Sequence, residues 1–125
     1  MGRMNISVVS IPVSDQQRAK AYYVDVLGFT VVEEAPFGGG MSWIQLAPPG
    51  SSGATVTLVT WFDAMPAGGL RGLVIDTDDI DAAYEDLLAR GADLGGPPSR
   101  MAGGIFVMVT DPDGNQFALH QEGSR

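Results

Sequence analysis

Few side chains in this sequence could carry out acid–base or metal chemistry, and only one of them is a histidine. The 125-residue chain contains His120 and no cysteine. Histidine can bind a metal ion or move a proton near neutral pH, whereas the lack of cysteine excludes disulfides, thiolate nucleophiles and zinc–sulfur sites. The neighbouring sequence supplies no obvious partner for His120. We therefore regard it as a weak catalytic candidate and expect a packed or exposed side chain.

Carboxylates are the other potential metal ligands, but their positions do not favour a site. A catalytic divalent ion needs about three nitrogen or carboxylate donors. The acidic residues fall instead in predicted helix caps, turns and exposed helix faces, at Asp15, Asp25, Glu85, Asp86, Asp111 and Asp113. A magnesium or calcium site built from oxygens alone is the disfavoured alternative. Phosphate-loop, dinucleotide and nucleophile-elbow motifs are also missing. We predict no metal and no cofactor.

Aromatic, sulfur-containing and amide side chains form a different kind of candidate site. Alternation along predicted strands 41–47 and 54–61 places such residues on one face of each strand, where they would make a wall for a small ligand. The predicted ligand-binding residues are Phe37, Met41, Trp43, Gln45, Thr57, Val59, Trp61, Phe106, Met108 and His120. The alternative is that this face forms a second core or a dimer contact. Arg100 and Met101, in predicted loop 95–104, would close over a ligand or simply belong to a structural loop.

Two predicted helices position these strands. The first spans 15–27, with a capping box formed by Ser14 and Gln17 and a C-terminal stop at Gly28. The second spans 80–90, begins after Asp78 or Asp79 and stops at Gly91. In both helices the apolar residues recur at the spacing of one buried face.

One strand precedes each helix and three strands follow it, so the same pattern occurs twice. The predicted strands are 6–13, 30–34, 41–47 and 54–61 in the first copy, and 70–75, 93–94, 105–110 and 116–121 in the second. Gly38-Gly39-Gly40 is interpreted as a turn or flexible flap, and residues 111–115 as the last hairpin turn. We predict an α+β fold with two βαβββ modules, at about 4–62 and 70–122, which form a curled mixed sheet around a cavity in one domain, 1–125.

The composition limits the kinds of ligand and partner that the protein is expected to bind. The formal net charge is −8, which repels nucleic acid and favours a cationic ligand over an anionic one, although acidity more often serves solubility alone. No stretch is apolar enough to predict a membrane span or a signal peptide. We expect a cytoplasmic protein. We also expect a homodimer, because a curled sheet leaves its cavity rim and edge strands uncovered in one chain.

An ordered set of short motifs resembles the vicinal oxygen chelate superfamily, which comprises glyoxalases, bleomycin resistance proteins and extradiol dioxygenases. The matching segments are Ile11-Pro12-Val13-Ser14-Asp15, Ala21-Tyr22-Tyr23, Val26-Leu27-Gly28-Phe29, Asp78-Asp79-Ile80 and Asp111-Pro112-Asp113-Gly114-Asn115. The resemblance implies paired βαβββ modules around a cavity that a homodimer completes. In metal-dependent members, the first and last strands of each module supply four ligands. The corresponding positions here are Val8, Thr57, Leu73 and Ala118, and none of these side chains is a competent ligand.

Three functions are therefore considered. The favoured one is a metal-free binder of a small, cationic or aromatic molecule, similar to the bleomycin resistance branch. The first alternative is a lyase, isomerase or dioxygenase-like enzyme that acts without the usual metal, through His120, Gln45 or a tyrosine. The second alternative is a structural or regulatory module without a ligand.

Overall fold

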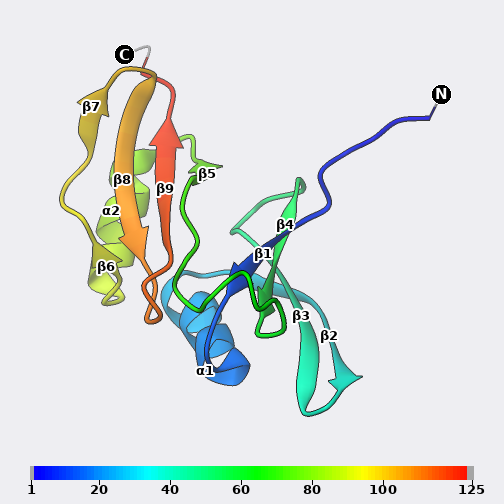
Figure 1. Ribbon diagram of the computed structural model, residues 1–125. Coiled ribbons are helices and arrows are strands. Elements are labelled where there is room, and N and C mark those ends of the chain that lie inside the picture. Colours follow the sequence, from blue (N-terminus) through cyan, green and yellow to red (C-terminus); the bar gives the residue numbers. More distant parts are fainter. Residues whose placement is uncertain (1, 124–125) are drawn as a thin grey trace.

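The computed structural model describes residues 2–123, in which two modules of similar topology follow one another (Figure 1). The first contains β1 (Val8–Pro12), α1 (Gln16–Ala21), the π-helical turn η1 (Tyr22–Val26), β2 (Thr30–Gly38), β3 (Met41–Ala47) and β4 (Thr55–Val59). The second contains β5 (Leu73–Asp76), α2 (Ile80–Ala89), β6 (Asp93–Leu94), β7 (Ser99–Met101), β8 (Gly104–Thr110) and β9 (Gln116–Gln121).

Each module forms its own mixed sheet, with the same strand order. Sheet A has the order β1-β4-β3-β2 and sheet B the order β5-β9-β8-β6. In both, the first strand runs parallel to the last strand, and the other pairs are antiparallel. The helix therefore serves as the crossover that a parallel pair requires. The predicted α+β fold of repeated βαβββ units is confirmed.

One strand of sheet B was not predicted. β7 lies inside the segment that we expected to be a loop, residues 95–104, and pairs with β8 from Ser99 opposite Phe106 to Met101 opposite Gly104. Gly103 makes the tight turn between them with a φ of 92°. Three residues are too few to produce a readable alternation, so the sequence carries no strand signal there.

The start of the first helix also differs from the prediction. Asp15 is the N-cap, and its carboxylate accepts a hydrogen bond from the backbone N–H of Arg18 at 3.0 Å. The predicted capping box is wrong, because Ser14 Oγ donates to Asp113 at 2.6 Å and Gln17 Nε2 donates to Glu34 at 3.0 Å. The carboxylate of Asp15 satisfies the helix terminus instead.

The end of the first helix is wider than a regular α-helix. The N–H of Leu27 donates to the carbonyl of Tyr22 at 3.2 Å, which is an i to i+5 bond. Gly28 then adopts a φ of 78°, and Gly91 ends the second helix with a φ of 87°, as the two glycine positions predict. The second helix is capped by Asp79, which accepts from the N–H of Ala82 at 3.0 Å.

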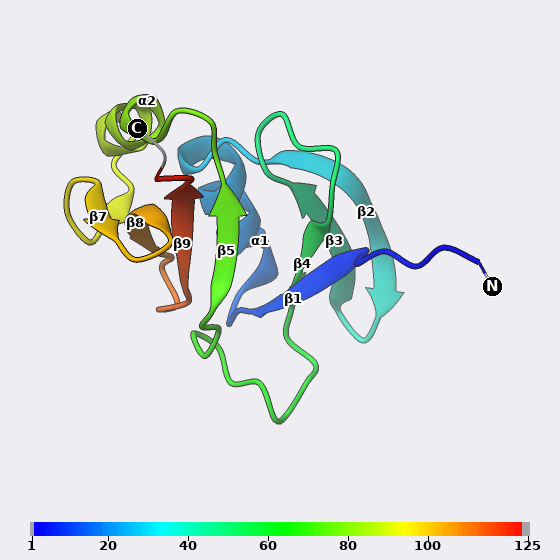
Figure 2. The same ribbon diagram turned by 90° about the horizontal axis from the view of Figure 1, so that it is seen from above.

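The apolar core belongs to both modules. Tyr23 of η1 is fully buried, and its ring makes edge contacts with Phe29 of the first module and lies 6.5 Å from Phe117 of β9. The core also contains Ile44 and Leu58 of sheet A. Figure 2 shows α1 lying between the strands of sheet A and those of sheet B. The two modules thus bury their helix-covered faces in one continuous core.

A buried polar network joins the modules at the predicted turn 111–115. The Asp111 carboxylate accepts hydrogen bonds from the Tyr23 hydroxyl, the Asn115 side-chain amide and the backbone N–H groups of Asp113 and Asn115, at 2.8 to 2.9 Å. Asn115 also donates to the carbonyl of Pro12 at 2.8 Å. Burial, together with the neighbouring carboxylate, raises the pKa of Tyr23, so its hydroxyl remains a donor.

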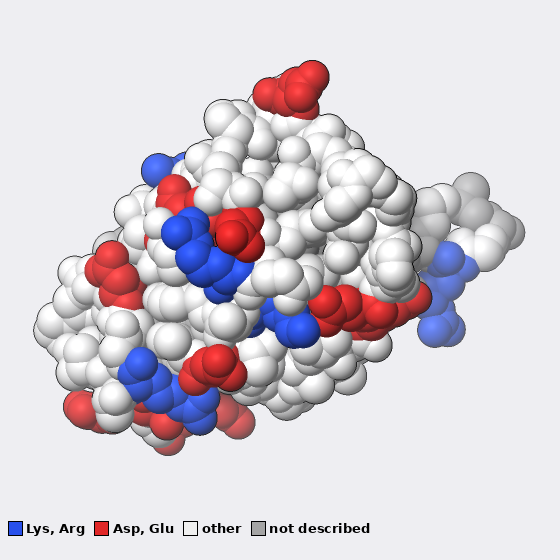
Figure 3. Space-filling model, turned by 90° about the horizontal axis from the view of Figure 1, so that it is seen from below, with Lys and Arg blue, Asp and Glu red and all other residues white. Residues whose placement is uncertain are grey.

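Charges are mixed on the face seen from below (Figure 3). There, Lys and Arg side chains are interspersed with Asp and Glu side chains. In the molecule as a whole, ion pairs include Lys20 with Glu34 at 2.7 Å and Arg90 with Asp86 at 3.3 Å. This face presents no broad basic patch of the kind that binds phosphate backbones. Within residues 2–123, no helix is both long and apolar enough to cross a membrane.

Candidate functional site

The predicted ligand wall of the first module lies on the outer face of sheet A, which we define as the face turned away from α1. Ile44 and Leu58 point into the core, so alternation places Trp43, Gln45 and Thr57 on the opposite side. Gln45 and Thr57 are direct partners across β3 and β4, and Thr57 is paired with Ser10 of β1. Three strands therefore contribute to this face.

A chain of hydrogen bonds fixes the polar groups of the outer face. The indole N–H of Trp43 donates to Gln45 Oε1 at 3.2 Å, and Gln45 Nε2 donates to the Thr55 hydroxyl at 2.8 Å. Thr55 in turn donates to the backbone carbonyl of Ser7 at 2.9 Å. These side chains use their hydrogen-bonding groups on one another, so the Trp43 ring has a fixed orientation and the Gln45 amide already has its partners. The face offers a ligand mainly aromatic and aliphatic surface.

Two residues of the predicted wall are covered in this structure. Thr57 and Val59 are each 1% exposed, so they contribute packing and not direct ligand contacts in this conformation. Strand alternation assigned them to the correct face but could not show what lies over them.

Stacked aromatic rings stand beside this wall. Phe37 near the end of β2 and Trp61 just after β4 have ring centroids 4.6 Å apart and planes inclined by 25°. Phe62 lies 6.2 Å from Trp61 in a tilted arrangement. Phe37 is 51% exposed, next to the β2–β3 turn at Gly39 and Gly40, whereas Gly38 of the predicted glycine run still pairs with Met41 in the sheet. Met41, also predicted, follows this turn and is partly buried. A stacked, accessible pair of rings is a natural platform for a flat molecule.

The remaining predicted residues lie on the corresponding outer face of sheet B. Phe106 and His120 are direct partners across β8 and β9, with ring centroids 4.8 Å apart. Met108 pairs with Ala118 on the same face and is exposed. The ten predicted ligand-binding residues therefore divide into two groups, one on each sheet.

His120 has two partners that the neighbouring sequence does not indicate. Its Nδ1 lies 2.7 Å from the Asp76 carboxylate and its Nε2 lies 2.6 Å from the carbonyl of Gly103. Both partners are acceptors, so the doubly protonated ring satisfies both contacts. The Gly103 carbonyl, followed by Asp76, raises the pKa of His120. The parallel pairing of β5 with β9 brings Asp76 opposite His120, which only a knowledge of strand order could have predicted.

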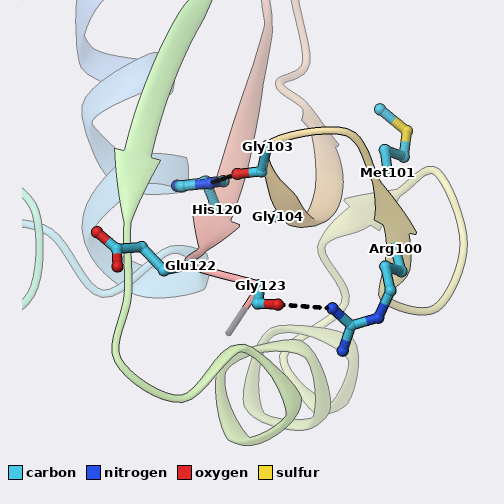
Figure 4. A pocket seen from close by; sticks show the side chains of 7 residues that line it. All are labelled: Arg100, Met101, Gly103, Gly104, His120, Glu122 and Gly123. Carbon is cyan, nitrogen blue, oxygen red and sulfur yellow. Dashed lines mark hydrogen bonds between the residues drawn. The ribbon is translucent and has the colours of Figure 1, made fainter. Parts of the chain in front are cut away.

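The turn beside His120 borders a shallow hollow of about 580 Å³ at the end of sheet B (Figure 4). Its lining includes Arg100, Met101 and Glu122. Arg100 donates to the carbonyl of Gly123 at 3.0 Å. A Cβ atom at Gly104 would come within 2.5 Å of His120 Nε2, so only glycine lets the turn approach the ring this closely.

The His120 contacts predict a pH-dependent contribution to stability. A pKa raised above the unfolded value of about 6.5 stabilises the folded protein below that pH, and the contribution is lost as the pH rises through the folded pKa. We expect the stability difference between the wild type and His120→Gln to shrink as the pH increases. Urea unfolding at several pH values measures this difference, and NMR titration of the single histidine gives its pKa. A midpoint at or below 6.5 would contradict the prediction.

A family comparison decides the classification. Residues 5–119 match the model of the Glyoxalase/Bleomycin resistance protein/Dioxygenase superfamily. The chain belongs to this superfamily. The resemblance predicted from the short motifs is thereby confirmed.

Several known proteins are similar to this chain over most of its length. TnmS3, an antibiotic binding protein from Streptomyces sp. CB03234, shares 41% sequence identity with this chain. The match covers 98% of this chain and 99% of the TnmS3 chain, and the two structures superpose with a TM-score of 0.88. The uncharacterized protein YetH of Bacillus subtilis is 34% identical over 93% of this chain and 97% of its own. Mitochondrial methylmalonyl-CoA epimerase of Mus musculus is 31% identical over 70% of this chain, which spans about half of that enzyme.

The metal positions implied by the superfamily do not fit a metal ion here. Val8, Thr57 and Ala118 lie on the outer faces of their sheets, but Leu73 packs against the core, so its assignment was wrong. Val74 is the β5 residue that pairs with Ala118. None of these side chains offers a carboxylate or imidazole. Within residues 2–123, no three His, Asp or Glu side chains gather closely enough to hold a metal.

Proposed function

We propose that this protein binds a small molecule with a flat aromatic part on the outer face of sheet A and leaves it chemically unchanged, without a metal. The observation that carries the proposal is the stack of the exposed Phe37 ring on the partly buried Trp61 ring, in the same module as the oriented ring of Trp43. Stacking of a planar ligand on this pair would remove apolar surface from water and add favourable ring contacts.

The comparisons support this kind of ligand. TnmS3 is described as an antibiotic binding protein and matches nearly the full chain at 41% identity. The net charge of −8 and the electron-rich faces of the indole rings both favour a cation. We therefore propose a planar, cationic, antibiotic-like compound as the preferred ligand class.

A second copy of the chain is proposed to complete the binding site. Val74 and Met108 on the outer face of sheet B are large, exposed apolar residues, and the outer face of sheet A presents the exposed Phe37. Contact between copies would cover both faces and enclose the ligand. In this arrangement the two groups of predicted ligand residues would meet across the interface.

The enzyme alternative has less support. The similarity to an epimerase concerns 70% of the chain, and His120 is the only histidine. Both of its ring nitrogens are already engaged, Nδ1 2.7 Å from the Asp76 carboxylate and Nε2 2.6 Å from the Gly103 carbonyl, so neither is presented to a substrate. Binding without turnover is therefore preferred over acid–base catalysis.

Titration with planar and non-planar cations tests the proposal. We expect proflavine and daunorubicin to quench the emission of the two tryptophans with saturation, and spermine, which is cationic but has no ring, to leave it unchanged. Calorimetry checks each affinity, and mass spectrometry checks that the ligand is recovered unaltered. Light scattering on the same samples gives the oligomeric state. Equal binding of spermine, or conversion of the ligand, would overturn the proposal.

A further inference from the structure

The two central strands of sheet A pair over an unusually short distance. β3 runs from Met41 to Ala47 along β2, and β4 runs from Thr55 to Val59 along β1. Between β3 and β4, however, the register contains only the pairs Gln45 with Thr57 and Leu46 with Val56. A regular antiparallel ladder would continue through the next residues. The strands therefore part beyond these two pairs.

One side-chain amide fills the gap where the strands part. Gln16 Nε2 donates to the carbonyl of Ser42 on β3 and to the carbonyl of Leu58 on β4, each at 2.7 Å. Gln16 Oε1 accepts from the N–H of Ser42 at 3.0 Å. A primary amide carries two donors and one acceptor, so this single side chain satisfies backbone groups of both strands. It does so where strand-to-strand hydrogen bonds would otherwise close the sheet.

The start of α1 holds Gln16 in place. Gln16 is the first residue of the helix. It directly follows the N-cap Asp15, whose carboxylate accepts a hydrogen bond from the N–H of Arg18. The helix therefore delivers the amide to the gap from the core side of sheet A, while the outer face lies on the other side. The residues adjacent to the bonded carbonyls are Trp43 on β3 and Val59 on β4, and Trp61 follows two residues later.

The gap also lies between the two tryptophans, because Trp43 is on β3 and Trp61 follows β4. Phe37 and Trp61 stack on each other, but among the described residues neither ring contacts Trp43. Trp43 is instead directed along its own strand by the hydrogen bond to Gln45. The separation of β3 from β4 thus sets the spacing between Trp43 and Trp61.

We propose that Gln16 is a positioning residue for the ligand face: its amide holds β3 and β4 apart and keeps open the space between Trp43 on β3 and Trp61 after β4, where the flat part of a ligand lies. This inference rests on the proposed function for its ligand, but the spacing of the strands is a property of the protein alone. Its two parts can therefore be tested separately.

The decisive variant is Gln16→Met, which keeps a long unbranched side chain and removes the amide. We expect the Ser42 amide proton to exchange roughly tenfold faster, as for the loss of one hydrogen bond. The tryptophan emission should shift as the strands close, and proflavine affinity should fall by about tenfold. Gln17→Met is the matched control, because Gln17 lies on the same helix and its amide donates to the exposed Glu34 carboxylate instead of to the strand backbone. It should leave all three measurements unchanged.

The outcomes separate this inference from the proposed function. Wild-type exchange at Ser42 and wild-type emission in Gln16→Met would overturn the role of Gln16, whether or not a ligand binds. Faster exchange throughout sheet A would also overturn it, because that result indicates general destabilisation. A local change at Ser42 with a shifted emission, in a protein that binds none of the probes, would support the spacing role and count against the proposed function.

A measurement on the wild type covers the case in which the variant does not fold. The side-chain NH2 protons of Gln16 should exchange with solvent roughly tenfold more slowly than those of Gln17, since both Gln16 contacts are to partly buried backbone carbonyls. Equal exchange of the two amides would contradict the inference without any substitution.

Discussion

Asp111→Ala is expected to lower the free energy of unfolding by roughly 3 to 5 kcal/mol, the largest stability effect that we predict for a single substitution in this chain. The Asp111 carboxylate is 4% exposed and accepts four hydrogen bonds. Alanine would leave the Tyr23 hydroxyl and the Asn115 amide buried without this acceptor. Because Tyr23 belongs to the first module and Asp111 to the second, the substitution also loosens the junction between them.

Urea denaturation followed by tryptophan emission measures the effect. Asp63→Ala, which removes an exposed carboxylate from the connecting segment, is the control for the change in net charge and should differ from the wild type by less than about 0.5 kcal/mol. Tyr23→Phe removes one donor and leaves the carboxylate, so it should cost only about 1 kcal/mol. A loss below 1 kcal/mol in Asp111→Ala would show that the network does not hold the modules together.

Trp61→Ala is expected to weaken proflavine binding by roughly thirtyfold, which corresponds to about 2 kcal/mol and is typical of a central aromatic contact. The substitution removes one member of the stacked pair and leaves Phe37 without its neighbour. Since Trp61 is itself a fluorescence reporter, calorimetry is the appropriate measurement.

Phe62→Ala is the matched control for Trp61→Ala. Phe62 is an exposed aromatic residue next in sequence, but its ring is tilted and lies 6.2 Å from that of Trp61. We expect at most a threefold change in affinity, in line with a peripheral contact. Equal losses in the two variants would indicate a general disturbance of the loop, and an unchanged affinity in Trp61→Ala would place the ligand elsewhere.

The sequence predicted the fold well because the signals for it are local. Gly28 and Gly91 end their helices, and the turn 111–115 lies where its proline and glycine place it. Such signals depend on the conformations that a residue and its close neighbours allow. The repetition of the whole pattern then predicted two equivalent modules, and the strand orders of the two sheets agree with it.

The site was predicted less completely because its key contacts join residues far apart in the chain. Asp76 meets His120 only through the parallel pairing of β5 with β9, and Gln16 reaches Ser42 and Leu58 across the sheet. Neither set of contacts leaves a regular spacing of residues that could be recognised in the sequence. Leu73 was misassigned for another reason: the run Leu-Val-Ile in β5 is apolar on both faces, so alternation could not show which side chains point inward.

The common core determines what an unfolding experiment on this protein can detect. Both tryptophans, Trp43 and Trp61, lie in the first module, whereas Asp111 and His120 lie in the second. Because Tyr23 packs against Phe117 and binds Asp111 across the junction, melting of either half exposes the other, as in a small protein with a single all-or-none transition. Indole emission from one half therefore reports the unfolding of both.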